Sequence, residues 1–186
     1  MLRICLLGPF RVERDGETIP HRAWARPKDR ALLKLLALDL GHLVPQDRLL
    51  DALWPDLEPA SAANSLHASV SRLRKLLGPA PLIRHDAAGY TLAAPDAVWV
   101  DIEEFRRLLG RAREWRRLGA WGPAAQAYRA AAALYRGDLF EDDPYVEWAL
   151  RPREQMREAH LALLEELADC LVHVGAPAEA LSLIHI

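Results

Sequence analysis

Apolar and polar residues alternate in short runs at the start of the chain. Residues 2–7 form an apolar run, and Val12 and Ile19 bracket Asp15–Gly16, a dipeptide that favours a two-residue hairpin turn. This pattern predicts that the chain opens with a small antiparallel sheet.

The spacing of apolar residues then changes to that of helices. Pro27–Leu40 is dense in Leu and Ala and is followed by Gly41, a residue that commonly ends a helix. Gln46–Trp54 follows Pro45, and proline is favourable at a helix start because its missing N–H is one that the helix leaves unpaired. A third helix is predicted over Ala62–Leu77.

The third helix has one apolar side and one polar side. An apolar stripe at i, i+4, i+7 and i+11 predicts its buried side: Leu66, Val70, Leu73 and Leu77. Small and polar residues project from the other side, where a helix could approach a groove closely: Asn64, Ala68, Ser71 and Lys75, with Arg72 and Arg74 beside them.

The third helix and the segment after it lack acidic residues altogether. Between Glu58 and Asp86 the charged residues are all basic, and two histidines accompany them: His67, Arg72, Arg74, Lys75, Arg84 and His85. The segment after the helix is predicted to be a hairpin, because extended residues 82–84 lead into 89–92. A basic helix followed by a hairpin is typical of a winged helix-turn-helix protein, so double-stranded DNA is the predicted partner.

Composition limits the class of protein. The chain has 186 residues with an apolar share of 51%, a charged share of 27% and a net charge of −2. Residues 1–98 carry 13 basic against 11 acidic side chains and residues 99–186 carry 11 against 15, which suits a half that faces nucleic acid joined to a half that faces protein. Cys5 and Cys170 are predicted to be buried thiols. Without a leader or a spanning apolar run, a cytoplasmic protein that does not contact membranes is expected.

The character of the chain changes from residue 97 on, where the strand pattern disappears. We therefore predict two domains, residues 1–95 and residues 96–186, with a boundary near Pro95–Asp96. The second domain is predicted to be all-helical, with helices at Ile102–Leu118, Pro123–Tyr135 and Arg153–His173 and the start of another at Pro177.

Two stretches of the second domain match each other. Ala112…Gly119-x-Trp121-x-x-Ala124 corresponds to Ala168…Gly175-x-Pro177-x-x-Ala180 with all offsets preserved. Small residues at this spacing let antiparallel helices pack closely, as in tetratricopeptide repeats. The extra length between the two stretches, around residues 138–152, is predicted to form an elaboration between the repeats.

These motifs resemble two known domains in series. Residues 1–95 resemble the OmpR-type winged-helix DNA-binding domain through Leu53-Trp54-Pro55, Val70-Ser71-Arg72-Leu73-Arg74-Lys75 and Gly89-Tyr90. Residues 98–186 resemble the bacterial transcriptional activation domain through Val100-Asp101…Phe105 and Leu134-Tyr135-Arg136-Gly137-Asp138-Leu139. In this order the pair is similar to the SARP-type regulators (Streptomyces antibiotic regulatory proteins).

The resemblance implies an activator that binds promoter direct repeats as side-by-side protomers. It implies a recognition helix whose Asn64, Arg72 and Arg74 contact DNA, and a hairpin wing that touches the neighbouring minor groove. It also implies a loop before that helix, residues 55–60, that contacts RNA polymerase through Asp56, Leu57 and Glu58.

The chemistry of each side chain assigns a contact within that surface. Arg and Asn can read guanine and adenine, so Arg72 and Asn64 are the predicted base readers, while Arg74 and Lys75 are predicted to neutralise phosphates. The remaining predicted DNA contacts lie on the same helix and on the hairpin: His67, Ser71, Arg84 and His85.

The chain departs from the family pattern in two places. Ala87, Ala88 and Thr91 surround Gly89–Tyr90 where such wings often carry Arg, and Tyr90 is therefore predicted to be a core residue. The sequence also ends within a predicted helix, shortly after Pro177.

Other functions were weighed against DNA binding. We find no phosphate loop, nucleophile elbow or cluster with metal-ligand spacing, so neither an enzyme nor a cofactor or metal is expected. Two alternatives remain: a tetratricopeptide-like adaptor that binds protein, and the N-terminal piece of a larger sensor regulator.

Overall fold

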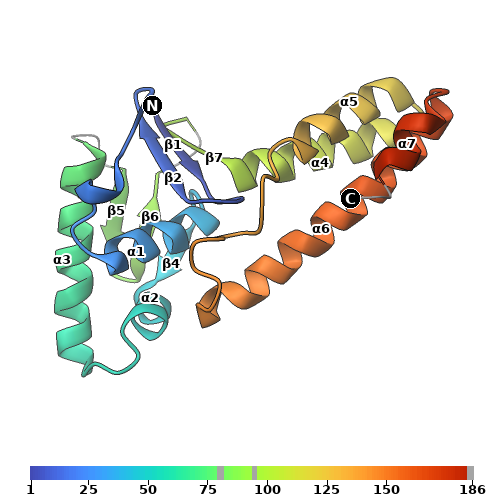
Figure 1. Cartoon of the computed structure of the whole chain (residues 1–186). Coiled ribbons are helices and arrows are strands. Elements are labelled where there is room, and N and C mark those ends of the chain that lie inside the picture. Colours follow the sequence, from blue (N-terminus) through green and yellow to red (C-terminus); the bar gives the residue numbers. More distant parts are fainter. Residues whose placement is uncertain (79–81, 94–95, 184–186) are drawn as a thin grey trace. The chain divides into compact units, whose positions relative to one another are not determined.

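The computed structural model describes residues 1–78, 82–93 and 96–183 (Figure 1). The chain divides into two compact units. The first consists of Met1–Cys5 and Arg11–Val100, and the second of Leu6–Phe10 and Asp101–Ile186. The first unit thus runs past the boundary predicted near residue 95, and neither unit is one continuous stretch of sequence.

The first unit opens with the predicted hairpin. β1 (Leu2–Cys5) pairs antiparallel with β2 (Arg11–Arg14), and β2 pairs with β3 (Glu17–Thr18). Asp15 and Gly16 both have positive φ, 53° and 88°, as a two-residue turn between twisted strands requires. The predicted hairpin is confirmed, although β1 ends at Cys5 and not at residue 7.

One strand was missed by the sequence analysis. The prediction that strands end before residue 97 is wrong, because β7 (Val98–Val100) pairs parallel with β1 and completes a sheet of order β3-β2-β1-β7. The side chains of Val98 and Val100 are buried in this sheet. Three residues are too few for a periodic signal, and the partner strand lies almost a hundred residues earlier in the sequence.

Three helices and a second sheet complete the first unit. The helices are α1 (Pro27–Leu38), α2 (Gln46–Leu53) and α3 (Pro59–Leu77), and a 3₁₀ turn, η1 (His21–Ala23), precedes them. The sheet has the order β4-β6-β5 and is formed by β4 (Leu43–Pro45), β5 (Ile83–Asp86) and β6 (Gly89–Leu92). The predicted winged helix-turn-helix with small sheets is confirmed, and α3 begins earlier than predicted, at Pro59.

The β5–β6 hairpin packs tightly against the rest of the first unit through two residues of β6. Tyr90 of β6 is 1% exposed, which confirms its predicted place in the core. Gly89 lies so close to β4 that an added Cβ would be 2.1 Å from the carbonyl oxygen of Val44. Any larger residue at position 89 would therefore push the hairpin away from β4.

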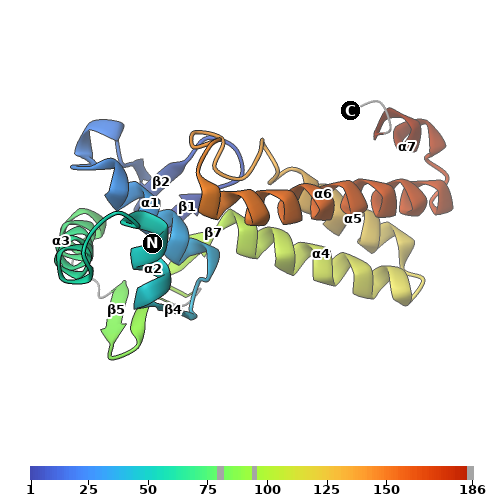
Figure 2. The same cartoon turned by 90° about the horizontal axis from the view of Figure 1, so that it is seen from below.

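The second unit is helical, as predicted. It contains α4 (Asp101–Arg117), α5 (Trp121–Ala132), α6 (Glu147–His173) and α7 (Pro177–Leu183), each packed on the next (Figure 2). Gly119 and Gly175 end α4 and α6 with φ of 72° and 77°. The two matching stretches of sequence are thus two equivalent turns between helices, each ended by a glycine in the left-handed region.

α6 starts six residues before the predicted position, at Glu147, and carries Pro152 inside it. The buried guanidinium of Arg153 holds the connection that leads into this helix. It donates hydrogen bonds to the carbonyl oxygens of Leu139, Asp143 and Pro144 at 2.9 Å each and to that of Phe140 at 3.4 Å. One side chain thus satisfies four main-chain acceptors of the elaboration between the two repeats.

The short segment Leu6–Phe10 belongs to the second unit through main-chain pairing. Gly8 donates its N–H to the carbonyl of Asp138, and Phe140 donates to that of Leu6, both at 3.0 Å. The buried carboxylate of Asp101, at the start of α4, accepts the N–H groups of Leu6 and Leu7 at 2.8–3.0 Å. Residues from the start, the middle and the second half of the sequence therefore meet at this point.

Cys5 and Cys170 are both free and buried, as predicted. Over the described ranges, no helix is both long enough and apolar enough to cross a bilayer.

A pH dependence is expected from His160, whose ring stacks on Tyr135 at 3.9 Å. Burial lowers the pKa of His160, so the unfolded chain takes up a proton more readily than the folded unit does. The contribution of this group to stability should be present above the ordinary imidazole pKa of about 6.5 and be lost as the pH falls below it. Thermal unfolding followed from pH 8 to pH 5 should show a shallower decline for His160→Phe than for the wild type. If the two proteins lose thermal stability equally with falling pH, His160 is not the source of the pH dependence.

Candidate nucleic-acid interface

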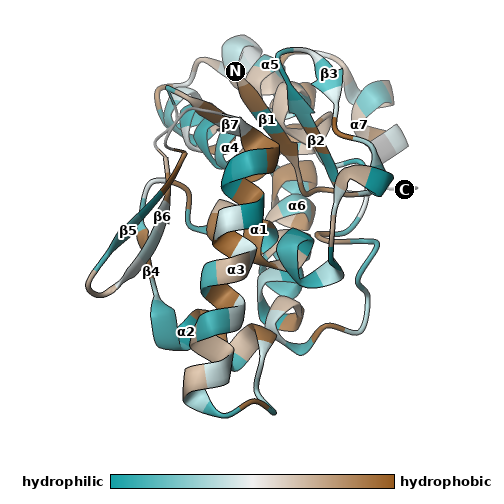
Figure 3. Ribbon diagram, turned by 90° about the vertical axis from the view of Figure 1, so that its left-hand side faces the viewer, coloured by the Kyte–Doolittle hydropathy of each residue, from teal (hydrophilic) through white to brown (hydrophobic). Residues whose placement is uncertain are grey.

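α3 presents a continuous polar stripe to solvent. Its apolar residues are buried, with Leu66 and Leu73 at 0% exposure, which confirms the predicted inward side. The exposed positions recur three or four residues apart along the helix: Ser61, Asn64, His67, Ala68, Ser71, Arg74 and Lys75. The ribbon of α3 correspondingly alternates between hydrophilic and hydrophobic stretches (Figure 3). Small side chains occupy the N-terminal half of this stripe and basic ones the C-terminal half, as the sequence pattern indicates.

Arg72 has an acidic partner that the sequence analysis did not identify. Its Nε and Nη2 each donate a hydrogen bond of 2.8 Å to the carboxylate of Asp29, which is 2% exposed, and Nη2 also donates to the hydroxyl of Ser69 at 2.9 Å. The bond to Asp29 raises the pKa of Arg72. Although α3 itself contains no acidic residue, its basic side is therefore not without an opposing acid, because Asp29 reaches Arg72 from the first turn of α1.

Arg74 is tied to the wing. Its Nε and Nη2 donate to the carbonyl oxygen of Ile83 in β5 at 3.1 and 2.8 Å, although the residue itself is exposed. This contact fixes the distance between the C-terminal half of α3 and the β5–β6 hairpin. Lys75, by contrast, is exposed and has no bonded side-chain partner within the described part of the chain.

Helix and wing enclose a shallow groove of about 410 Å³. His85 of β5 stacks on Tyr90 at 4.4 Å, and His67 of α3 meets His85 edge-on at 6.0 Å. Burial raises the pKa of Tyr90, in agreement with its place in the core beneath the two histidines. The groove is lined by polar and basic groups from both elements: His67, Ser71, Arg74, Lys75, His85 and Tyr90, with Val70 at its base.

Arg84 stands on the outer side of the hairpin. It is exposed on β5, next to His85, and lies outside the lining of the groove. The structure thus brings His67, Ser71 and His85 together and leaves Arg84 on the edge of the wing.

The loop predicted to contact RNA polymerase is exposed. Asp56, Leu57 and Glu58 all face solvent between α2 and α3, and the apolar side chain of Leu57 is 44% exposed. The N–H of Leu57 donates to the carbonyl of Trp54 at 3.2 Å, which gives the loop a defined turn.

Comparison with known proteins agrees with this architecture. Residues 21–92 match the family model described as "Transcriptional regulatory protein, C terminal", and residues 100–185 match that described as "Bacterial transcriptional activator domain". The fold and the exposed helix thus define a winged-helix transcriptional regulator with an appended activator domain. The chain belongs to the SARP-type family of bacterial transcriptional regulators.

Individual relatives are longer than this chain. The chain is 34% identical over 181 residues to the regulatory protein AfsR of Streptomyces coelicolor, which covers 97% of this chain and 18% of AfsR. It is 28% identical to the regulatory protein DnrI of Streptomyces peucetius over 95% of this chain and 67% of DnrI. A structure of Mycobacterium tuberculosis EmbR in complex with a low-affinity phosphopeptide superposes with a TM-score of 0.86 at 27% identity, and covers 99% of this chain and 50% of EmbR.

Proposed function

We propose that this chain binds promoter DNA sequence-specifically and activates transcription in the cytoplasm by contacting RNA polymerase. The observation that carries the proposal is the exposed stripe of α3, which is free of acidic residues and continues into a polar groove beside the wing. An α-helix is about as wide as the major groove, so such a stripe can reach base edges while basic groups at its sides reach phosphates.

Within this proposal Asn64 is the leading base reader. It is exposed at the centre of the stripe, and its amide can pair with adenine in two bonds. His67 and Ser71 are placed beside it to contact base edges or nearby phosphates, while Lys75, Arg84 and His85 reach the backbone. All six of these side chains face solvent on α3 or on the β5–β6 hairpin.

The roles that we propose for Arg72 and Arg74 differ from the base reading and phosphate neutralisation expected from the sequence. Both have Nε and Nη2 engaged within the protein, Arg72 by Asp29 and Arg74 by Ile83. Reading guanine with two bonds would require Arg72 to leave a buried carboxylate unpaired, which is costly. We therefore propose that each arginine contacts DNA through Nη1 alone and mainly holds α3 in place.

The proposed contact with RNA polymerase rests on the exposed loop between α2 and α3, with Asp56, Leu57 and Glu58 as the contacting residues. Binding to direct repeats by side-by-side protomers is supported by the family alone. The domains proposed for these two tasks are residues 1–95 and 96–186.

DNA binding is tested with a duplex selected from a random library by the wild-type chain and a scrambled duplex of the same composition. Asn64→Ala should weaken binding to the selected duplex by about 1–3 kcal/mol, because two bonds to one base are lost, and should leave the scrambled duplex unaffected. Gln155→Ala, which removes an exposed amide from α6, is the matched control and should change neither. Fluorescence anisotropy at several salt concentrations measures both affinities.

Two results would decide against this assignment. Equal losses on both duplexes would show that Asn64 does not read sequence. If the wild type binds neither duplex at low salt, DNA is not its partner and the protein-binding adaptor becomes the better description.

A further inference from the structure

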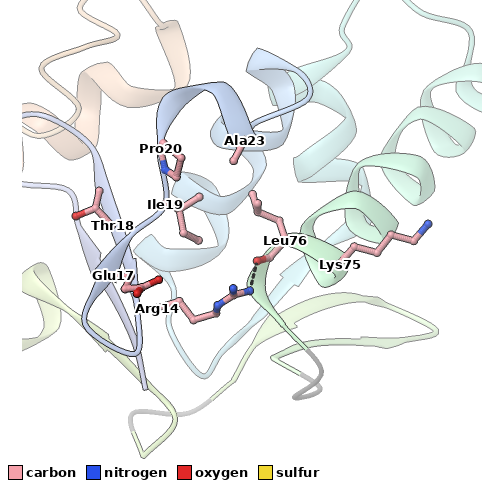
Figure 4. A pocket seen from close by; sticks show the side chains of 8 residues that line it. All are labelled: Arg14, Glu17, Thr18, Ile19, Pro20, Ala23, Lys75 and Leu76. Carbon is pink, nitrogen blue, oxygen red and sulfur yellow. Dashed lines mark hydrogen bonds between the residues drawn. The ribbon is translucent and has the colours of Figure 1, made fainter.

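The segment that leads into α1 lies against the C-terminal half of α3. One hollow is lined by Thr18, Pro20 and Ala23 on one side and by Lys75 and Leu76 on the other, and Arg14 donates a 2.9 Å hydrogen bond to the carbonyl of Leu76 across it (Figure 4). A second hollow next to it is formed by the same two elements: Ala23, Ala25 and Asp29 face Arg72, Leu73, Lys75 and Leu76. Residues 18–29 are thus fixed beside the helix by contacts on both sides of Ala23.

The position of Lys75 shows on which side of α3 the wing and the segment before α1 lie. It lines the groove shared with the wing and also both hollows shared with the segment before α1. At about 100° per residue, His67 and Arg74 lie to one side of Lys75 on the helix, and Arg72 and Leu76 lie to the other. The wing therefore borders the exposed stripe of α3 along one side and the segment before α1 borders it along the opposite side.

That second border is basic. Arg22, Arg26 and Lys28 are all exposed, and within the described residues none of the three is bonded to a carboxylate. We call these three residues the α1 flank. Of the acidic residues near this border, Asp29 is buried and already paired with Arg72, and Glu17 lines the first hollow together with Arg14.

Several arginines of the second unit have carboxylate partners on other helices. Three of these pairs have lengths of 2.6–3.1 Å: Arg113 with Glu166, Arg116 with Asp169, and Arg129 with Glu179. Such pairs cancel the local charge, whereas the charge of the α1 flank is left uncompensated beside α3. The flank is therefore available to an anion from outside the chain.

We propose that the α1 flank is a second phosphate-binding surface, which contacts the DNA backbone on the side of α3 opposite the wing. The inference rests on the proposed function, because α3 must occupy the groove for the flank to reach a strand. A helix in the major groove has a phosphate strand along each side of it, the groove being about 12 Å wide. The wing with Arg84 meets one strand, and Arg22, Arg26 and Lys28 meet the other.

The flank contributes affinity without sequence preference. Lys and Arg on long flexible stems neutralise phosphates as charges, and such contacts position a protein on DNA without reading bases. Each neutralised phosphate releases counterions and adds about 0.9 to the slope of log K against log salt. A contact of this kind is therefore recognised by its salt dependence.

The test is the variant Arg22→Gln/Arg26→Gln/Lys28→Gln, measured on the selected and the scrambled duplex over a series of salt concentrations. We expect the salt slope to fall by about two to three, and the affinity for both duplexes to fall by the same factor. The matched control is Arg111→Gln/Arg117→Gln/Arg151→Gln, which removes three exposed positive charges from the second unit and should change the slope by less than about one. Circular dichroism verifies that both variants are folded.

The outcomes separate this inference from the proposed function. If the wild type binds DNA and the flank variant keeps the slope of the control, the flank does not contact phosphates and only the inference fails. A loss confined to the selected duplex would also overturn it, since the flank would then read sequence. If the wild type binds no duplex at all, the proposed function fails and the inference fails with it.

Discussion

Replacing Arg153 with Met should lower the free energy of unfolding of the second unit by about 3–5 kcal/mol. Methionine fills much of the same volume but removes the donor of four carbonyls, of which those of Phe140 and Asp143 also accept the N–H groups of Asp143 and Val146. Urea unfolding followed by circular dichroism measures the change.

Two further variants show whether the hydrogen-bond pattern of Arg153 is responsible. Arg151→Met removes an exposed arginine two residues away and should change stability by less than about 0.5 kcal/mol. Arg153→Lys keeps the charge, but a lysine ammonium is compact and cannot reach all four carbonyls as the planar guanidinium does. This variant should therefore recover only part of the lost free energy of unfolding. If Arg153→Met proves as stable as Arg151→Met, the four bonds contribute nothing and the elaboration is held by other contacts.

The second large effect is expected at Asp101, whose buried carboxylate accepts the N–H groups of Leu6, Leu7 and Ile102. Asp101→Asn should cost about 3 kcal/mol, because an NH₂ group replaces one of the two acceptor oxygens and then faces main-chain N–H donors. Hydrogen exchange provides a local measurement: the amides of Leu6 and Leu7 should lose protection more than those of α5.

A control for Asp101 is available on the same segment. Asp142 accepts the N–H of Phe10 at 3.2 Å but is exposed, so water can replace it, and Asp142→Asn should cost less than about 1 kcal/mol. Similar losses for the two variants would mean that burial of Asp101 is not what makes its bonds important.

Periodic features were predictable from the sequence. The apolar stripe of α3, the Asp15–Gly16 turn and the exposure of Asn64 and Lys75 all follow from spacing or from turn chemistry within a few residues. Tyr90 was also assigned to the core correctly, as an aromatic residue on the predicted hairpin strand. Each of these features depends on residues that lie close together in the sequence, so it can be predicted from a single sequence.

Contacts between distant residues were not predictable in this way. The pairing of Asp29 with Arg72 joins residues 43 apart, and nothing near Asp29 marks it as buried. β7 and the bonds from Leu6 to Asp101 join residues about 95 apart. In each case the partner is defined only by the fold, which is why the DNA-contacting role first given to Arg72 had to be reconsidered.

The division of the chain determines whether the two units can be separated by one break in the gene. The main chain passes between the units at residues 5–6, 10–11 and 100–101, so a gene fragment for the winged helix also encodes Leu6 and Leu7, which are buried in the other unit. Recombination at a single junction cannot transfer either unit whole. The winged-helix unit and the helical unit can therefore be exchanged only together.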